Sequence, residues 1–290
     1  MPQETSIKIK DGTTCITDMA FRGCSGLKNI SIPESVTSIG TAFMNCDGLT
    51  GIKIPNSVTI IEGGAFYGCN NLVNITIPSS VTEIGDMAFS DCANLESITI
   101  PSSCTSIGEE AFSGCEKLKN ISFPDSILSI GRYAFDYIPW FENQPDGLIY
   151  IGRVAYKYKG KMPKGTSIII KDGTYSIAER AFANCDGLTD ITIPNSVTKI
   201  GLHSFSECSG LTEVVLPKSI TIVEDGFFYC CTGLKDLLIN RNSPPEFIQD
   251  WRYPEYSLIP ECTLHVPKGC KEAYENEEPW CDFKEIVDDL

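Results

Sequence analysis

Hydrophobic and polar residues repeat along this chain with a period of about 23 residues. The copies share the template Ile-x-Ile-Pro-x-Ser-Val-Thr-x-Ile-Gly-x-x-Ala-Phe-x-x-Cys-x-x-Leu. A fixed period of about 20 to 50 residues indicates a solenoid, in which each coil buries its apolar positions against its neighbours. The copies begin near Ile7, Ile30, Ile52, Ile75, Ile98, Ile121, Ile168, Ile191 and Val214.

The template predicts the elements of one coil. Ile-x-Ile is a short strand with both isoleucines inward and the middle residue outward, and the proline after it ends the strand. The Val and Ile that follow, three residues apart, predict a second short strand or an extended turn. The glycine then leads into one helical or 3₁₀ turn that carries Ala-Phe. The fold class is therefore mainly β with short helical turns, a right-handed curved solenoid of about nine coils of 22–23 residues.

Two repeat positions predict buried columns. An aromatic at the same phase in every coil is typical of core, and neighbouring thiols about 4.8 Å apart with parallel Cβ vectors favour free cysteines over disulfides. Only Cys262, Cys270 and Cys281 could form a bridge. The phenylalanines are Phe21, Phe43, Phe66, Phe89, Phe112, Phe135, Phe182, Phe205 and Phe228, and the cysteines are Cys24, Cys46, Cys69, Cys92, Cys115, Cys185, Cys208 and Cys231.

The pattern defines the boundaries of the chain's parts. Residues 1–239 form the solenoid, with an insertion at 136–166, and residues 240–290 form a C-terminal cap. The periodicity lapses through Trp251–Pro254 and resumes at Cys262–Val266, which predicts a final strand. A short helix is expected over 271–278, and Trp280 with Phe283 would cover the last coil.

The insertion predicts a β-hairpin, because Leu148–Ile151 and Val154–Tyr158 flank the two-residue connection Gly152-Arg153, suited to a II′ turn. Its aromatic and basic side chains would make a contact patch for a partner. The alternative, which we favour, is that the hairpin covers the flank of the stack with its tyrosines packed inward. The candidate partner-binding residues are Tyr150, Arg153, Tyr156, Lys157, Tyr158 and Lys159.

A second candidate surface is the row of outward strand positions. These residues are small, polar and nearly uncharged, and they could bind an extended partner across several coils, or they could be ordinary solvated strand. The row consists of Ser31, Lys53, Thr76, Thr99, Ser122, Thr192 and Val215.

Composition narrows the function further. The net charge of −15 argues against binding a nucleic-acid backbone or an anionic membrane, and no apolar run is long enough to span a membrane. The two histidines lie in unrelated segments; His203 is expected to be exposed, and neither has neighbours that indicate a triad. We therefore expect no enzyme, no cofactor and no metal site. The first coil lacks a cap and a signal peptide, which suggests a trimmed chain and leaves an open strand edge for weak end-to-end pairing of an otherwise monomeric protein.

The repeat template closely resembles the BspA-like leucine-rich-repeat proteins over Ile7 to Leu234. The insertion from Pro139 to Lys159 and the ending from Cys262 to Tyr274 also look like recurring elements of that family. The resemblance implies a bacterial surface or secreted protein, and it implies binding to host extracellular-matrix or surface proteins, or co-aggregation with neighbouring cells. It supplies no catalytic residues. The alternative function is a structural spacer for another domain.

Overall fold

The computed structural model describes residues 5–250 and 261–290, and the chain forms two compact units that divide between Gln144 and Pro145. We call them unit 1 and unit 2. The division lies inside the predicted insertion. The segment Trp251–Pro254 lies outside the described residues.

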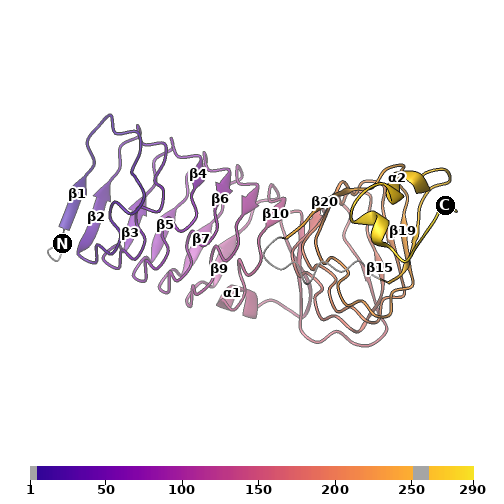
Figure 1. The fold of residues 1–290 in the computed structure, drawn as a ribbon. Helices are drawn as coiled ribbons and strands as arrows, with labels where there is room; N and C mark the ends of the chain where they lie inside the picture. Colours follow the sequence, from indigo (N-terminus) through magenta and orange to yellow (C-terminus); the bar gives the residue numbers. More distant parts are fainter. Residues whose placement is uncertain (1–4, 251–260) are drawn as a thin grey trace. The chain divides into compact units, whose positions relative to one another are not determined.

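Unit 1 is a stack of coils with one strand of each coil on either side (Figure 1). The Ile-x-Ile strands run parallel in register, so that Ile52 lies beside Ile75 and Thr76 lies beside Lys53. The strands on this side are β1 (Thr5–Lys8), β2 (Leu27–Ser31), β3 (Gly51–Lys53), β5 (Asn74–Thr76), β7 (Ser97–Thr99) and β9 (Asn120–Ser122). They are hydrogen-bonded in three pairs, β1-β2, β3-β5 and β7-β9, and we call this side the first sheet.

The predicted second strand is also present in unit 1. The Val–Ile segment of successive coils forms a parallel sheet in the order β10-β8-β6-β4. We call it the second sheet. Its strands are β4 (Ile60–Ile61), β6 (Glu83–Ile84), β8 (Ser106–Ile107) and β10 (Ser129–Ile130), and the short helix α1 (Pro139–Glu142) follows them.

The core of each unit consists of the predicted columns. Phe89 is fully buried, and its ring stacks between those of Phe66 and Phe112 at centroid distances of 5.4 and 5.3 Å. In unit 2 the rings of Phe182 and Phe205 stack at 5.3 Å. The prediction that equal positions in the repeat become columns in space is confirmed.

The buried cysteines also follow the prediction. The Cys92 thiol donates a hydrogen bond to the carbonyl oxygen of Phe66 at 3.2 Å, and Cys115 donates to Phe89 in the same way. Burial raises the pKa of Cys115 to about 12, so the neutral thiol persists at physiological pH. All fourteen cysteines of the chain are free thiols, including Cys262, Cys270 and Cys281.

The segment between the two strands of a coil differs from the predicted helical turn. It consists of successive turns in which Met87 and Asp91 have left-handed φ values of 54° and 59°. Between them, the Phe89 amide donates to the Ala111 carbonyl of the next coil at 2.8 Å. A helix would point these amides along its own axis, whereas the left-handed residues turn alternate amides toward the neighbouring coil. The turn segments therefore add a hydrogen-bonded ladder between coils.

Unit 2 begins with the predicted hairpin. Strands β11 (Gly147–Ile151) and β12 (Val154–Lys159) pair antiparallel, and Gly152 at their connection has a φ of 56°. The hairpin forms the edge of a six-stranded sheet, because β12 pairs in parallel with β14. We call it the second sheet of unit 2. The other strands of that sheet are β14 (Ser176–Ile177), β16 (Lys199–Ile200), β18 (Ile222–Glu224) and β20 (Glu246–Ile248).

The first side of unit 2 contains more strands than the repeat pattern predicted. Three strands beyond Val214 extend it, so the described residues hold twelve strands of this type where about nine coils were expected. The strands are β13 (Thr166–Ile169), β15 (Leu188–Thr192), β17 (Glu213–Leu216), β19 (Asp236–Ile239), β21 (Thr263–His265) and β22 (Glu285–Val287). Strand β21 is the final strand predicted at Cys262–Val266. Strand β19 keeps the repeat period, with Leu237 beside Val214, but its sequence departs from the template, and β22 follows two short helical elements.

The last segment of the chain packs its aromatic side chains into the core of unit 2. The helix α2 (Lys271–Glu275) and the 3₁₀ turn η2 (Trp280–Asp282) follow β21. Trp280 is 1% exposed and stacks with Phe283 at 6.0 Å, and its indole N–H donates to the Pro245 carbonyl at 3.1 Å. The indole therefore has a hydrogen-bond partner in the core, as a buried tryptophan requires.

Candidate functional site

The first sheet of unit 1 presents two rows of outward side chains. Residues two apart on a strand share a face, so each strand contributes one side chain to each row. We call them the inner row and the outer row of unit 1. The inner row is Ser6, Asn29, Gly51, Asn74, Ser97 and Asn120, and the outer row is Lys8, Ser31, Lys53, Thr76, Thr99 and Ser122.

The rows of unit 1 offer hydroxyl and amide groups with few charges. The candidates Ser31, Lys53, Thr76, Thr99 and Ser122 are all exposed, as the sequence predicted for outward positions. Hydroxyl and carboxamide groups both donate and accept hydrogen bonds, so this surface can pair with the polar groups of a partner.

Two adjoining hollows run across this face of unit 1. One, of about 490 Å³, lies over β5 and β7 and includes Thr76 and Ser102 in its lining. The other, of about 400 Å³, lies over β7 and β9 and ends at Trp140 and Gln144. The two hollows share Ser97, Ile98 and Thr99 as lining residues. The outer row is therefore indented over three successive coils.

Trp140 was not among the predicted site residues. Its packing places it in the lining of the hollow over β7 and β9. Its ring meets those of Phe123 and Phe135 edge-on, at centroid distances of 5.1 and 5.6 Å. Phe123 stands where the template has isoleucine, so the aromatic residue in that repeat was the available signal. Its partner Trp140 comes from the insertion, whose path the repeat does not predict.

The hairpin residues do not form a projecting patch. The Tyr156 side chain is 3% exposed, and Tyr150 and Tyr158 pack against the core of unit 2. The Tyr150 hydroxyl accepts a hydrogen bond from the Lys171 amide at 3.0 Å. Arg153 is exposed, with its guanidinium 5.7 Å from the ring centroid of Tyr175. The favoured alternative, in which the tyrosines pack inward, matches this arrangement.

The two remaining hairpin candidates lie on strand β12. Lys157 and Lys159 are half-buried, at positions that face Ile149 and Gly147 across the hairpin. Strand β12 continues the second sheet of unit 2, so the hairpin residues lie in a different sheet of this unit from the candidate Thr192 on β15.

The first sheet of unit 2 carries different chemistry in the same two rows. Thr192 and Val215 belong to an outer row that is mainly apolar, and the inner row beside it is mainly acidic. The outer row is Ile169, Thr192, Val215, Leu238, His265 and Val287, and the inner row is Ser167, Asp190, Glu213, Asp236, Thr263 and Glu285.

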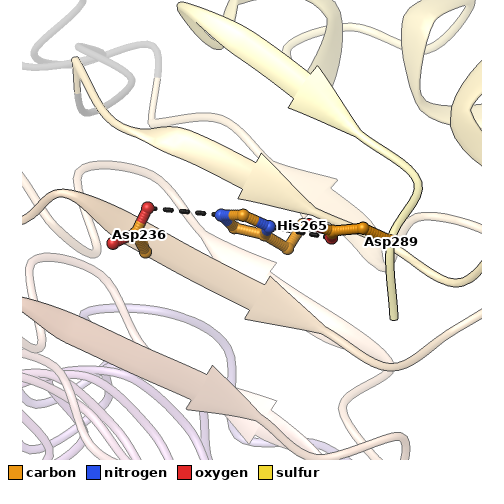
Figure 2. Close-up of polar contacts among 3 residues, drawn as sticks. All are labelled: Asp236, His265 and Asp289. Atoms are coloured by element: carbon orange, nitrogen blue, oxygen red, sulfur yellow. Dashed lines mark hydrogen bonds and ion pairs between the residues drawn. The ribbon is translucent and has the colours of Figure 1, made fainter.

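His265 in this outer row lies between two carboxylates (Figure 2). Its Nδ1 is 2.9 Å from Asp289 Oδ1 and its Nε2 is 3.2 Å from Asp236 Oδ1. Burial acts to lower the pKa of His265, and the hydrogen bonds to Asp289 and Asp236 outweigh it, so the pKa is raised. Neutral imidazole has only one N–H, so both carboxylates are bonded only when the ring is protonated.

The second histidine, His203, corrects a prediction. It was expected to be exposed, but it is 5% exposed and its ring meets that of Tyr229 edge-on at 6.0 Å. Gly226 leaves room for this ring, because a Cβ at that position would lie 2.3 Å from His203 Cε1. Burial lowers the pKa of His203, with the Arg180 charge as the next cause. The ring therefore belongs to the interior of unit 2.

A titration of stability tests the His265 contact. Because the folded-state pKa is raised, the stabilisation is complete below the unfolded pKa of about 6.5 and is lost as the pH rises through the folded value. We expect His265→Gln to lower the free energy of unfolding by about 0.5–1 kcal/mol at mildly acidic pH, since the carboxylates are partly exposed. At alkaline pH the difference should vanish. Urea unfolding at both pH values measures it, and Asp289→Asn should remove part of the same increment. A difference that grows with pH would contradict the assignment.

Within the part of the chain that the structure describes, no group of three His, Cys, Asp or Glu side chains is placed to hold a metal ion. None of the helices in residues 5–250 and 261–290 has the length and apolar character that crossing a membrane requires.

Comparison with known proteins identifies the repeat. A family model described as BspA type leucine rich repeat region, with six copies, matches residues 3–46, 41–159 and 150–251. No curated protein matches the chain.

Several solved structures resemble the chain. A leucine-rich repeat protein from Bacteroides ovatus is 22% identical, with 98% of this chain and 92% of that chain covered and a TM-score of 0.47. A leucine rich cell surface protein from Faecalibacterium prausnitzii is 23% identical, with 98% and 76% covered and a TM-score of 0.38. The pneumococcal vaccine antigen PcpA is 19% identical, with 98% and 94% covered and a TM-score of 0.38.

Proposed function

Because the chain belongs to the BspA-type leucine-rich-repeat family, we propose that it is a protein-binding or adhesion module of a bacterial cell surface or secreted protein. Its partners would be extracellular-matrix or surface proteins of a host or of neighbouring cells. The fold is of a kind that typically carries no catalytic site, and we propose that this chain is not an enzyme.

The observation that carries the proposal is the exposed first sheet of unit 1 with its two adjoining hollows. A regular sheet whose outward side chains are exposed to solvent offers a partner several equivalent contacts in a line. The outer row from Thr76 to Ser122 spans three coils, about 10 Å at the usual strand spacing. Trp140 at its end provides an aromatic anchor of the kind enriched in protein interfaces.

Binding of the full chain to a panel of extracellular-matrix proteins tests this function. We expect at least one partner to bind above the background of an unrelated acidic protein, as measured by surface plasmon resonance. Absence of binding across the panel would contradict the proposal and favour the spacer role.

A matched pair of substitutions locates the surface. Thr99→Arg places a long charged side chain in both hollows and should weaken binding of that partner roughly tenfold or more, because the clash lies at the centre of the contact. Thr59→Arg makes the same exchange at an exposed position just before β4, on the second side of unit 1, and should leave affinity unchanged. Equal losses in the two variants would contradict the assignment to the first sheet.

A further inference from the structure

The outer row of unit 2 exposes apolar side chains where unit 1 exposes hydroxyls. Ile169 is 76% exposed and Val215 is 47% exposed, while Leu238 and Val287 are half-buried. The strand register places all of them on one face. In unit 1 the equivalent positions hold serine, threonine and lysine, so the fold does not require apolar residues there. We call these four residues of unit 2 the apolar strip, which Thr192 and His265 interrupt. Exposed apolar side chains gathered on one face mark an interaction surface.

The inner row beside this strip is acidic. Asp190, Glu213 and Asp236 occupy the same phase on β15, β17 and β19, and Glu285 occupies it on β22. Glu213 lies beside Asp236 on paired strands, where like charges repel at about 4.8 Å of strand spacing. In the described part of the chain, neither Glu213 nor Glu285 has an ion pair with a lysine or arginine.

His265, the basic residue of the outer row of unit 2, does not neutralise the acidic inner row. Its one ring is bonded to both Asp236 and Asp289, so a single positive charge is shared by two carboxylates (Figure 2). The acidic row and the apolar strip therefore run side by side, two residues apart along each strand, or about 7 Å. A partner that covers both must combine cationic groups on one edge with apolar groups on the other.

We propose that the first sheet of unit 2 docks a basic amphipathic segment of a protein partner. Lysine or arginine side chains of the segment would lie along Asp190, Glu213 and Asp236, and its apolar side chains would cover Ile169 and Val215. The inference rests on the proposed protein-binding function and specifies the partner's chemistry for this unit. The chain's net charge of −15 favours the approach of such a segment from solution.

The spacing of the rows suits a segment that crosses the strands. From β15 to β22 the acidic row extends over four strand spacings, about 19 Å. A helical segment of about 14 residues has nearly that length, and its i and i+4 residues repeat every 6 Å or so along one edge. One edge of such a helix can therefore follow the acids while the neighbouring edge meets the apolar strip.

Three synthetic peptides of about 14 residues test the proposal with the full chain. The first has lysines on one helix edge and leucines on the next; the second keeps the lysines and replaces leucine by serine; the third replaces lysine by glutamate. We expect the first to bind best in fluorescence anisotropy, the second more weakly, and the third not at all. Raising the salt from about 50 to about 300 mM should weaken the first complex, because exposed charges are screened.

Variants of the face make the test specific. Glu213→Lys and Val215→Thr should each weaken binding of the lysine–leucine peptide, the charge reversal by about tenfold. The matched controls Glu96→Lys and Ile60→Thr alter exposed residues of unit 1 and should leave it unchanged. Circular dichroism shows whether each variant is folded.

The outcomes separate this inference from the proposed function. Equal effects of face and control variants, or equal binding of the glutamate peptide, would overturn it. A chain that binds a matrix protein but none of the peptides would retain the proposed function and overturn the inference. A chain that binds the lysine–leucine peptide through Glu213 but binds no matrix protein would retain the inference and overturn the proposed function. If the occupant is a second copy of this chain, sedimentation will show a dimer that Val215→Thr dissociates, and the inference fails.

Discussion

Replacing Phe89 with alanine is expected to destabilise unit 1 by about 3–5 kcal/mol. The ring is fully buried and lies in van der Waals contact between two other rings, so its loss leaves a cavity that rigid coils on both sides cannot close. Urea unfolding followed by circular dichroism measures the change. Because each coil contacts only its neighbours, the loss falls on the interfaces with the coils of Phe66 and Phe112.

An exposed aromatic at another position of unit 1 provides the control. The Tyr137 side chain is 84% exposed, and Tyr137→Ala should change the free energy of unfolding by no more than about 0.5 kcal/mol. A loss below about 1 kcal/mol for Phe89→Ala would contradict the stacked core, because the usual cost of such a deletion is several times larger.

Replacing Gly85 with alanine is expected to cost about 1–3 kcal/mol. Its backbone has no left-handed φ, so the requirement for glycine is purely steric. An added Cβ would lie 2.6 Å from the Gly63 backbone nitrogen of the preceding coil, closer than real Cβ atoms come to backbone. The Gly85 amide donates to the Ile61 carbonyl at 2.7 Å, so separating the coils would lengthen this hydrogen bond.

Gly51→Ala is the matched exchange. The nearest atom to its added Cβ would be the Asn74 carbonyl oxygen at 3.5 Å, an ordinary contact. It should leave stability within about 0.5 kcal/mol of the original chain. Thermal unfolding of both variants compares them directly, and equal midpoints would show that coils do not approach closely at Gly85.

The repeat predicted the fold because residues at the same position of successive copies have the same structural environment. Phe66, Phe89 and Phe112 formed a column for this reason, and the outward positions of the Ile-x-Ile strands were placed correctly from side-chain alternation alone. The turn segment was predicted less well. Met87 gives no signal of a left-handed backbone, whereas the template overlooked the signal at the Asp91 position, where other coils carry Gly or Asn.

The site chemistry was predictable in unit 1 and hidden in unit 2. Thr76 and Thr99 repeat at the expected phase, whereas His265 comes from a strand outside the regular repeat. Its partners Asp236 and Asp289 lie 29 and 24 residues away, and only the register of β19, β21 and β22 brings them together. The basic and aromatic hairpin suggested a contact patch, but composition does not reveal that Tyr156 points into the core.

The most direct test of the binding account is an arginine scan of unit 1, read out as the affinity for a matrix partner. Thr76, Thr99 and Ser122 lie in the outer row of the first sheet, whereas Thr59, Thr82 and Thr105 are exposed on the opposite side at the same period. We predict that arginine at each of the first three positions weakens binding and that arginine at each of the other three does not. Losses of affinity at Thr59, Thr82 or Thr105 that equal those in the outer row would contradict the assignment of binding to the first sheet of unit 1.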